Sequence, residues 1–147
     1  MSGPALAMQL LVYPITDCDL DRKSYHQFVG NALVLNRGDM VWFWDQYAPD
    51  PAVRTNPYAS PLRAPDLAGL PPAYLITAEF DPLREEGFAF AHRLQDAKVP
   101  VEHRHYASQI HAFFTFVNVL DDADRAVADA GAAARAAVLA AVEEAGK

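Results

Sequence analysis

The sequence predicts an α/β fold built on a short parallel sheet. Three short apolar segments, residues 8–13, 73–78 and 101–106, have the character of strands. Helical patterns follow the second and third of these segments, over about 82–98 and 121–145. Because strands that alternate with helices favour parallel pairing with crossover helices, we expect about three parallel strands in an incomplete sheet.

Each expected strand has a local reason. Met8–Tyr13 (MQLLVY) is a short apolar run that Pro14 ends, which indicates a buried strand. Ala73–Ala78 (AYLITA) is a second buried strand. Val101–Tyr106 (VEHRHY) alternates in character, as is typical of a strand at a sheet edge.

The segment between the first two strands is long and irregular. We expect an insertion over residues 17–60 in a domain that otherwise fills residues 1–147. A short aromatic helix is expected at Met40–Tyr47, with Asp39 as its N-cap and Pro49 at its end. The many prolines of residues 49–72 indicate an extended, ordered connection.

Two longer helices complete the expected fold. The first follows Asp81 and Pro82 and runs to about Lys98. Its apolar positions fall on one face: Leu83, Phe88, Ala91 and Leu94. The second is rich in alanine and runs from a cap at Asp121 or Asp122 to about Ala145.

Composition and charge limit the classes of protein that fit. The chain of 147 residues, 52% of them hydrophobic, suffices for one globular domain with a core. A net charge of −7 without a basic patch argues against a nucleic-acid partner. Cys18 is the only cysteine, and no apolar run is long enough to span a bilayer. Because residues 1–11 lack the features of a signal peptide, we expect a cytoplasmic protein.

Two residues at the expected strand ends could carry chemistry. Asp81 follows the second strand, and His111 follows the third, so both fall at the end of the sheet where α/β sites form. A carboxylate that accepts a hydrogen bond from an imidazole would orient it as a general base. For each residue a structural interpretation competes: Asp81 as a helix cap, and His111 as a half-buried loop histidine.

The motifs around these residues resemble a known family. The run LPPAYLITAEFDPLREEGFAFAHRLQDAKVPVEHRHY and the later IHAFF are similar to the C-terminal half of the hormone-sensitive-lipase-like esterases. The upstream segments QLLVYPITD, WFWDQY and NPYASPL are similar to the same family, so the resemblance covers about residues 4–120. It implies an α/β-hydrolase fold, a small carboxylic ester as substrate, and no cofactor or metal. It also implies that Asp81 is the acid and His111 the base of a catalytic triad.

The sequence departs from the family at the nucleophile and near the histidine. The nucleophile elbow needs a G-x-S-x-G turn, and none of the four serines lies in one: Ser2, Ser24, Ser60 and Ser108. The glycine-rich oxyanion loop is missing too, and in the family both elements come earlier in the chain. Where the family has glycine after the histidine, this chain has Ala112.

These observations leave two functions open. The first is a fragment of an ester hydrolase that supplies Asp81 and His111, while the serine and oxyanion loop come from a preceding segment or another chain. The second is a non-catalytic remnant or interaction module. Its exposed sheet edges, at the first strand or at Val101–Tyr106, would recruit a complementing chain or form a homodimer.

Two further groups of side chains have alternative interpretations. Trp42, Phe43 and Trp44 could line an acyl pocket, although aromatic clusters more often belong to the core. His103 and His105 face the same side of a strand, but two histidines without a third ligand are a weak indication of zinc.

Overall fold

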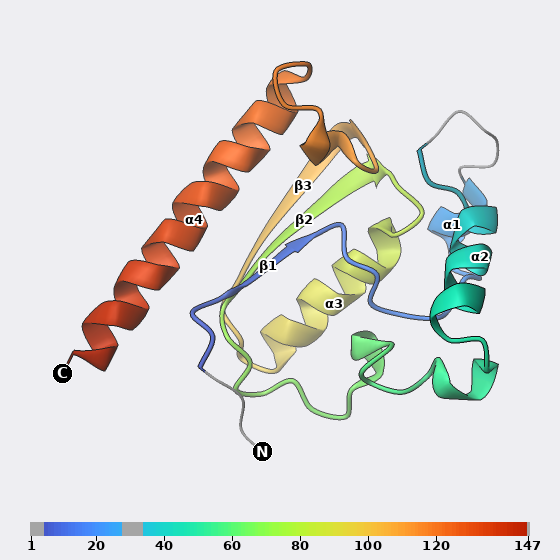
Figure 1. The fold of residues 1–147 in the computed structure, drawn as a ribbon, viewed down its shortest axis with the longest axis horizontal. Coiled ribbons are helices and arrows are strands. Elements are labelled where there is room, and N and C mark those ends of the chain that lie inside the picture. The colour runs from blue at the N-terminus through green and yellow to red at the C-terminus, as the bar shows by residue number, and fades with distance from the viewer. Residues whose placement is uncertain (1–4, 28–33, 147) are drawn as a thin grey trace.

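A three-stranded parallel sheet lies at the centre of the computed structural model, which describes residues 5–27 and 34–146 (Figure 1). Its strands β1 (Gln9–Val12), β2 (Ala73–Phe80) and β3 (Val101–Ile110) pair in the order β1-β2-β3. The expected α/β fold with about three parallel strands is therefore confirmed.

The two long helices cover opposite faces of the sheet (Figure 1). Helix α3 (Arg84–Asp96) buries Phe90, Ala91 and Leu94 in one apolar cluster with Leu75 of β2. On the other face, Ile76 of β2 belongs to a cluster with alanines of α4 (Asp121–Ala145): Ala123, Ala126 and Ala130. Successive β2 side chains thus enter different cores, as the two-residue period of a strand requires.

Helix α3 lies unusually close to β2 at Gly87. A Cβ atom added there would come within 2.8 Å of the Cγ2 atom of Thr77. Glycine is therefore needed for close contact between helix and strand. This contact fixes the position of the first turn of α3, which borders the end of the sheet where β2 and β3 finish.

The connection between β1 and β2 contains short helical elements. These are α1 (Lys23–Gln27), α2 (Arg37–Tyr47) and two 3₁₀ turns, η1 (Pro51–Val53) and η2 (Pro61–Arg63). Helices α1 and α2 lie to the right of the sheet in Figure 1, whereas η2 packs next to α3. Residues 28–33 of the expected 17–60 insertion lie outside the described residues.

The start of α2 corrects the sequence-based expectation. The helix begins at Arg37, and its N-cap is Asn36 rather than Asp39. Asp39 is the third residue of the helix, and its carboxylate accepts the backbone N–H of Asn36 at 3.0 Å. The two side chains form a reciprocal capping box, which satisfies amide groups that the first turn leaves free. The cap therefore precedes the aromatic run by a full turn.

Other helix and strand boundaries differ by a few residues from those expected from the sequence. Strand β3 extends past Tyr106 to Ile110, because pairing with β2 resumes at Phe80 after an irregularity. Helix α3 begins at Arg84, three residues after Asp81. Helix α4 begins at Asp121, and its N-cap position is Leu120, which has no side chain that can cap.

The short helix α1 was not expected from the sequence. It packs Tyr25 into a third apolar cluster with Met40, Trp44 and Leu83. This cluster joins the connection to the start of α3, next to the carboxyl ends of the strands.

Candidate active site

The structure brings Asp81 and His111 into contact. Asp81 follows the last residue of β2, and His111 follows the last residue of β3. Because these strands are parallel neighbours, their carboxyl ends place both side chains at one edge of the sheet. The Nδ1 atom of His111 lies 2.9 Å from the Oδ2 atom of Asp81. The carboxylate is fully buried, and 18% of the histidine side chain is exposed.

Asp81 also has the capping role that its sequence suggests. Its other carboxylate oxygen, Oδ1, accepts the backbone N–H of Leu83 at 2.8 Å, in the turn that leads into α3. The two interpretations of Asp81 are therefore compatible, since each uses a different oxygen. This second bond fixes the rotation of the carboxylate, so that Oδ2 points to the imidazole.

The ring of His111 packs against Tyr13. The two ring centroids are 4.4 Å apart, and Tyr13 is also 6.2 Å from the ring of Phe113. Burial raises the pKa of the Tyr13 hydroxyl above its ordinary value, and the charge of Asp81 raises it further. Tyr13 therefore stays a neutral phenol that holds one face of the imidazole.

The backbone on both sides of this ring contact is strained. Tyr13 has φ of +35° and Ala112 has φ of +69°, in the left-handed region that favours glycine. Ala112 is the position where the resembling family has glycine. The chain adopts the conformation that glycine permits, at a cost in strain, and the turn η3 (Phe113–Thr115) follows.

An apolar pocket opens beside the histidine. It has a volume of about 350 Å³, and His111 lines it together with residues of four segments: Val12, Tyr13, Pro14, Ile15, Leu35, Met40, Phe43 and Leu83. A second pocket of about 320 Å³ shares Ile15, Met40 and Phe43 with the first and reaches Trp44 and Tyr47. The shared residues make the two pockets neighbours, and both are lined almost wholly by apolar side chains.

The aromatic run of α2 divides between core and pocket. Trp44 is buried in the third cluster and lines the second pocket, whereas Phe43 lines both pockets. Trp42 is 58% exposed and lines neither of these two pockets. The two interpretations of this run therefore apply to different residues of it.

Comparisons with known proteins match this fold. Residues 1–115 match a protein family described as having the alpha/beta hydrolase fold. The chain belongs to the α/β-hydrolase fold family.

Among curated relatives of this α/β hydrolase, carboxylic ester hydrolase LipN of Mycobacterium tuberculosis is 41% identical over 112 residues, 76% of the chain and 30% of LipN. Ethyl acetate hydrolase of Pseudomonas putida is 33% identical over 80% of the chain and 36% of its own length. The chain thus spans about a third of the length of these relatives.

Solved esterase structures also superpose on this chain. The thermostable carboxylesterase EstE1, cloned from a metagenomic library, superposes with a TM-score of 0.85 at 34% identity, over 90% of this chain and 45% of its own. A thermostable esterase from Pseudomonas putida superposes with a TM-score of 0.74 at 44% identity, over 92% of this chain and 41% of its own. These four relatives of the α/β hydrolase are all named as ester hydrolases or esterases.

In this α/β hydrolase, the hydroxyl groups of the described serines donate hydrogen bonds to groups other than His111. The hydroxyl of Ser24 donates to the carbonyl of Pro82, and that of Ser60 donates to the carbonyl of Arg54. Ser108 donates to the carboxylate of Asp122. Within residues 5–27 and 34–146, no hydrogen bond joins the Nε2 atom of His111 to another side chain.

A second histidine–carboxylate pair, His105 and Glu79, differs from His111 and Asp81 in the hydrogen bonding of the second ring nitrogen. The Nε2 atom of His105 lies 3.1 Å from Oε2 of Glu79, but its Nδ1 atom lies 3.0 Å from the hydroxyl of Thr77. The same hydroxyl is 2.9 Å from Nε2 of His103. Both ring nitrogens of His105 are thus engaged, whereas only Nδ1 of His111 contacts another side chain among the described residues.

The His103 and His105 pair needs no metal to explain it. Burial lowers the pKa of His103, and the neighbouring His105 lowers it further, so His103 is held neutral. Phe88 packs edge-on against both rings. In the part of the chain that the structure describes, no group of three or more metal-ligating side chains could hold an ion. None of the described helices is long and apolar enough to cross a membrane.

Proposed function

We propose that this chain supplies the acid and the base of a Ser-His-Asp triad in a carboxylic ester hydrolase. The observation that carries the proposal is the 2.9 Å contact between Nδ1 of His111 and Oδ2 of a fully buried Asp81, beside an apolar pocket. In this proposal the 147 residues are the C-terminal half of a hydrolase domain. The nucleophilic serine and the oxyanion donors come from residues outside them.

The proposed reaction assigns one role to each nitrogen of His111. Its Nδ1–H donates to Asp81, which leaves Nε2 free to take the proton of the serine hydroxyl as the oxygen attacks the ester carbonyl. The buried carboxylate stabilises the imidazolium that results. Nε2–H then gives the proton to the leaving alkoxide. In the second step Nε2 takes a proton from a water molecule as it attacks the acyl-enzyme, and returns that proton to the serine oxygen as the carboxylic acid is released.

The pocket supports a substrate of modest size. Its lining is apolar, and its volume of about 350 Å³ suits an ester with a short- to medium-length chain. Leu35, Met40 and Phe43 of the connection between β1 and β2 line this pocket. Ile15 and Phe43, which line both pockets, would contact the acyl or alcohol part of the ester.

A complementation assay tests this proposal. The chain is coexpressed with the part of LipN that precedes the region matched here, and the complex is treated with a fluorophosphonate and with p-nitrophenyl butyrate. We expect a serine of the added segment to be labelled and the ester to be hydrolysed. His111→Ala should abolish both, while Ser108→Ala should change neither. Equal labelling and hydrolysis with His111→Ala would contradict the proposal.

The exposed sheet edge favours a second function, an interaction module. Leu10 in β1 is 42% exposed, and β1 pairs with β2 on one side only among the described strands. Apolar residues in the last part of α4 are also exposed: Val138 (53%), Leu139 (58%) and Val142 (64%). Such an edge and face recruit another polypeptide. If the added LipN segment binds but no serine is labelled, this second function is favoured.

A further inference from the structure

A buried glutamate in the first turn of α3 holds the loop that follows β1. Glu86 is fully buried, and its Oε1 atom accepts the backbone N–H of Thr16 at 2.6 Å and that of Asp17 at 3.3 Å. Its Oε2 atom accepts the hydroxyl of Tyr25 at 2.9 Å. The Thr16 hydroxyl donates to the backbone carbonyl of Glu86 at 3.2 Å. One side chain thus joins α3, the loop and α1.

The loop that Glu86 holds carries residues of the candidate active site. Its first residue, Tyr13, packs on the His111 ring and donates its backbone N–H to Ile76 of β2 at 2.7 Å. Ile15, next to Thr16, lines both apolar pockets. The loop is therefore anchored at one end by the sheet and at the other by Glu86.

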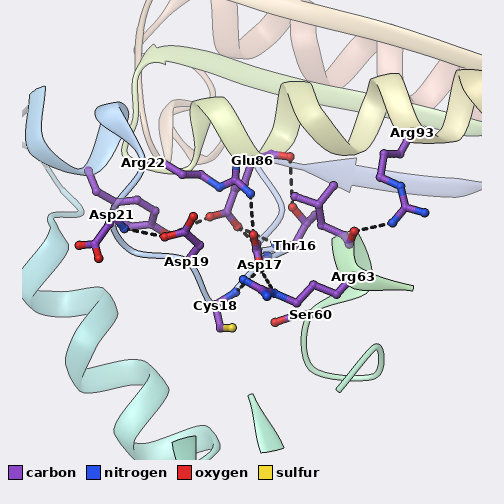
Figure 2. A network of polar contacts seen from close by, with 12 residues as sticks. Thr16, Asp17, Cys18, Asp19, Asp21, Arg22, Ser60, Arg63, Glu86 and Arg93 are labelled. Atoms are coloured by element: carbon purple, nitrogen blue, oxygen red, sulfur yellow. Dashed lines mark hydrogen bonds and ion pairs between the residues drawn. The ribbon is translucent and has the colours of Figure 1, made fainter. Parts of the chain in front are cut away.

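A second layer of charges surrounds the carboxylate (Figure 2). Arg22 donates to Oδ2 of the buried Asp17 at 2.5 Å, and Arg63 donates to its Oδ1 at 2.6 Å. The Nε atom of Arg22 is buried without a hydrogen-bond partner among the described residues. Asp17 is thus shared between two guanidinium groups, and the positive charge of Arg22 also lowers the pKa of Glu86.

Stability alone does not explain an ionisable group at this place. Burial raises the pKa of Glu86 from 4.5 to about 7, and the N–H and O–H donors and Arg22 offset only part of that effect. Asp81 and Glu86 both also raise the pKa of Tyr25. Glu85, in the same turn, points elsewhere and accepts the backbone N–H of Ser24. A buried group that is costly to ionise, and that holds a loop whose Ile15 lines the pockets, is a candidate functional residue.

We propose that Glu86 is a positioning residue, whose carboxylate holds the Tyr13–Asp17 loop so that Tyr13 packs on His111 and Ile15 faces the pocket. Its carboxyl accepts hydrogen bonds from three neutral donors, which would lose their acceptor without it, and leaving buried donors unpaired is costly. The inference rests on the proposed function, since positioning His111 matters only if that residue acts. Glu86 itself touches no reacting atom.

NMR of the chain alone gives the first test. We expect a strong NOE between the rings of Tyr13 and His111 at pH 5.5 in the wild type and in Glu85→Gln, the matched control. Glu86→Ala should lose it. In the wild type the NOE should weaken at pH 8.5, where the Glu86 carboxyl is ionised and its burial opposes closure of the loop. In Glu86→Gln, which keeps the shape and the two amide contacts, it should change less between these pH values.

Glu86→Gln has no carboxyl proton to lose, so comparing it with the wild type isolates the effect of the Glu86 carboxyl. A residue that only fills space would give the two proteins the same pH dependence, and that result would overturn the proposal. So would an undiminished NOE in a folded Glu86→Ala. If Glu86→Ala does not fold, the comparison with Glu86→Gln decides alone.

The second test uses the complex with the LipN segment. Glu86→Ala should lower kcat/KM for p-nitrophenyl butyrate by about tenfold, and Glu85→Ala should leave it within about twofold. A complex of the wild-type chain that hydrolyses nothing would count against the proposed function, while the NMR result would still decide whether Glu86 positions the loop. Equal losses in the Glu86 and Glu85 variants would contradict the positioning role.

Discussion

One carboxylate oxygen of Asp81 contacts His111 while the other holds the turn into α3. Oδ2 lies 2.9 Å from Nδ1 of the imidazole, and Oδ1 accepts the backbone N–H of Leu83 at 2.8 Å. Because separate atoms make the two bonds, a substitution can remove one and keep the other.

Asp81→Asn should separate orientation of the imidazole from capping. If the amide oxygen replaces Oδ1, the turn keeps its acceptor, and the free energy of unfolding should fall by less than about 1 kcal/mol. The amide NH₂ group then faces Nδ1, so neutral His111 should change from the Nδ1–H to the Nε2–H tautomer. Imidazole ¹⁵N chemical shifts measure this. In the LipN complex, kcat should fall on the order of 10³–10⁴-fold.

Asp81→Ala is the contrasting variant, since it removes both acceptors and leaves the Leu83 N–H unpaired. It should lower stability by about 1–2 kcal/mol more than Asp81→Asn does. Equal urea midpoints for the two variants would show that the capping bond contributes nothing. A His111 tautomer that is unchanged in Asp81→Asn would show that the carboxylate does not orient the ring.

Gly87→Ala should destabilise the protein. A methyl group at position 87 would lie 2.8 Å from Cγ2 of Thr77, a fully buried side chain, so α3 or β2 must shift. Overpacking of this kind costs about 1–3 kcal/mol. Gly131→Ala in α4 is the control, because nothing lies within 4 Å of its added methyl group. It should raise stability by about 0.5–1 kcal/mol through helix propensity. Urea unfolding of both variants measures the difference, and a stabilising Gly87→Ala would refute the close contact.

Local patterns in the sequence predicted the layers of the fold because each element has its own period. The continuous apolar run AYLITA predicts a strand buried on both faces, and the apolar face of residues 84–96 predicts which side of the helix is buried, whatever their distant partners are. The end of β3 was harder to predict from the sequence. Its last residues pair with β2 only because an irregularity lies between Ala78 and Phe80, and the local sequence carries no sign of that pairing.

The candidate site could be predicted in part, because the order of strands and helices places two of its residues. Asp81 and His111 follow strands that topology makes neighbours, so the order of elements was enough to expect them together. Glu86 was not expected as a contact, because its donors Thr16, Asp17 and Tyr25 lie 61–70 residues away in the chain. The one available signal was a second acidic residue in the first turn of α3, and that is also a common way to complement the helix dipole.

Ala112→Gly should stabilise the histidine loop. Ala112 has φ of +69°, a conformation that costs a residue with a Cβ atom about 1–2 kcal/mol, while glycine loses about 0.5–1 kcal/mol through the entropy of its unfolded state. The net gain should be up to about 1.5 kcal/mol in urea unfolding. Asn118→Gly, at φ of +63°, should gain less, because asparagine tolerates this region. A larger gain at Asn118 would contradict the strain assigned to Ala112.

Stability should depend on pH through Glu86. Its pKa is about 7 in the folded protein against 4.5 ordinarily, so the native state binds this proton more tightly than the unfolded state does. The contribution of Glu86 to stability is therefore fully present below pH 4.5 and is lost as the pH rises to about 7. The whole change is worth about 3 kcal/mol. Glu86→Gln, which has no proton to lose, should lack this decline.

The measurement is urea unfolding of the wild type, Glu86→Gln and Glu85→Gln at pH 5, 6, 7 and 8. Relative to the wild type, Glu86→Gln should gain stability steadily up to about pH 7 and level off above it, whereas Glu85→Gln should stay parallel to the wild type. A Glu86→Gln curve that is also parallel to the wild type would mean that the carboxyl is ionised throughout this range. The donors of Thr16, Asp17 and Tyr25, together with Arg22, would then outweigh the burial of the charge.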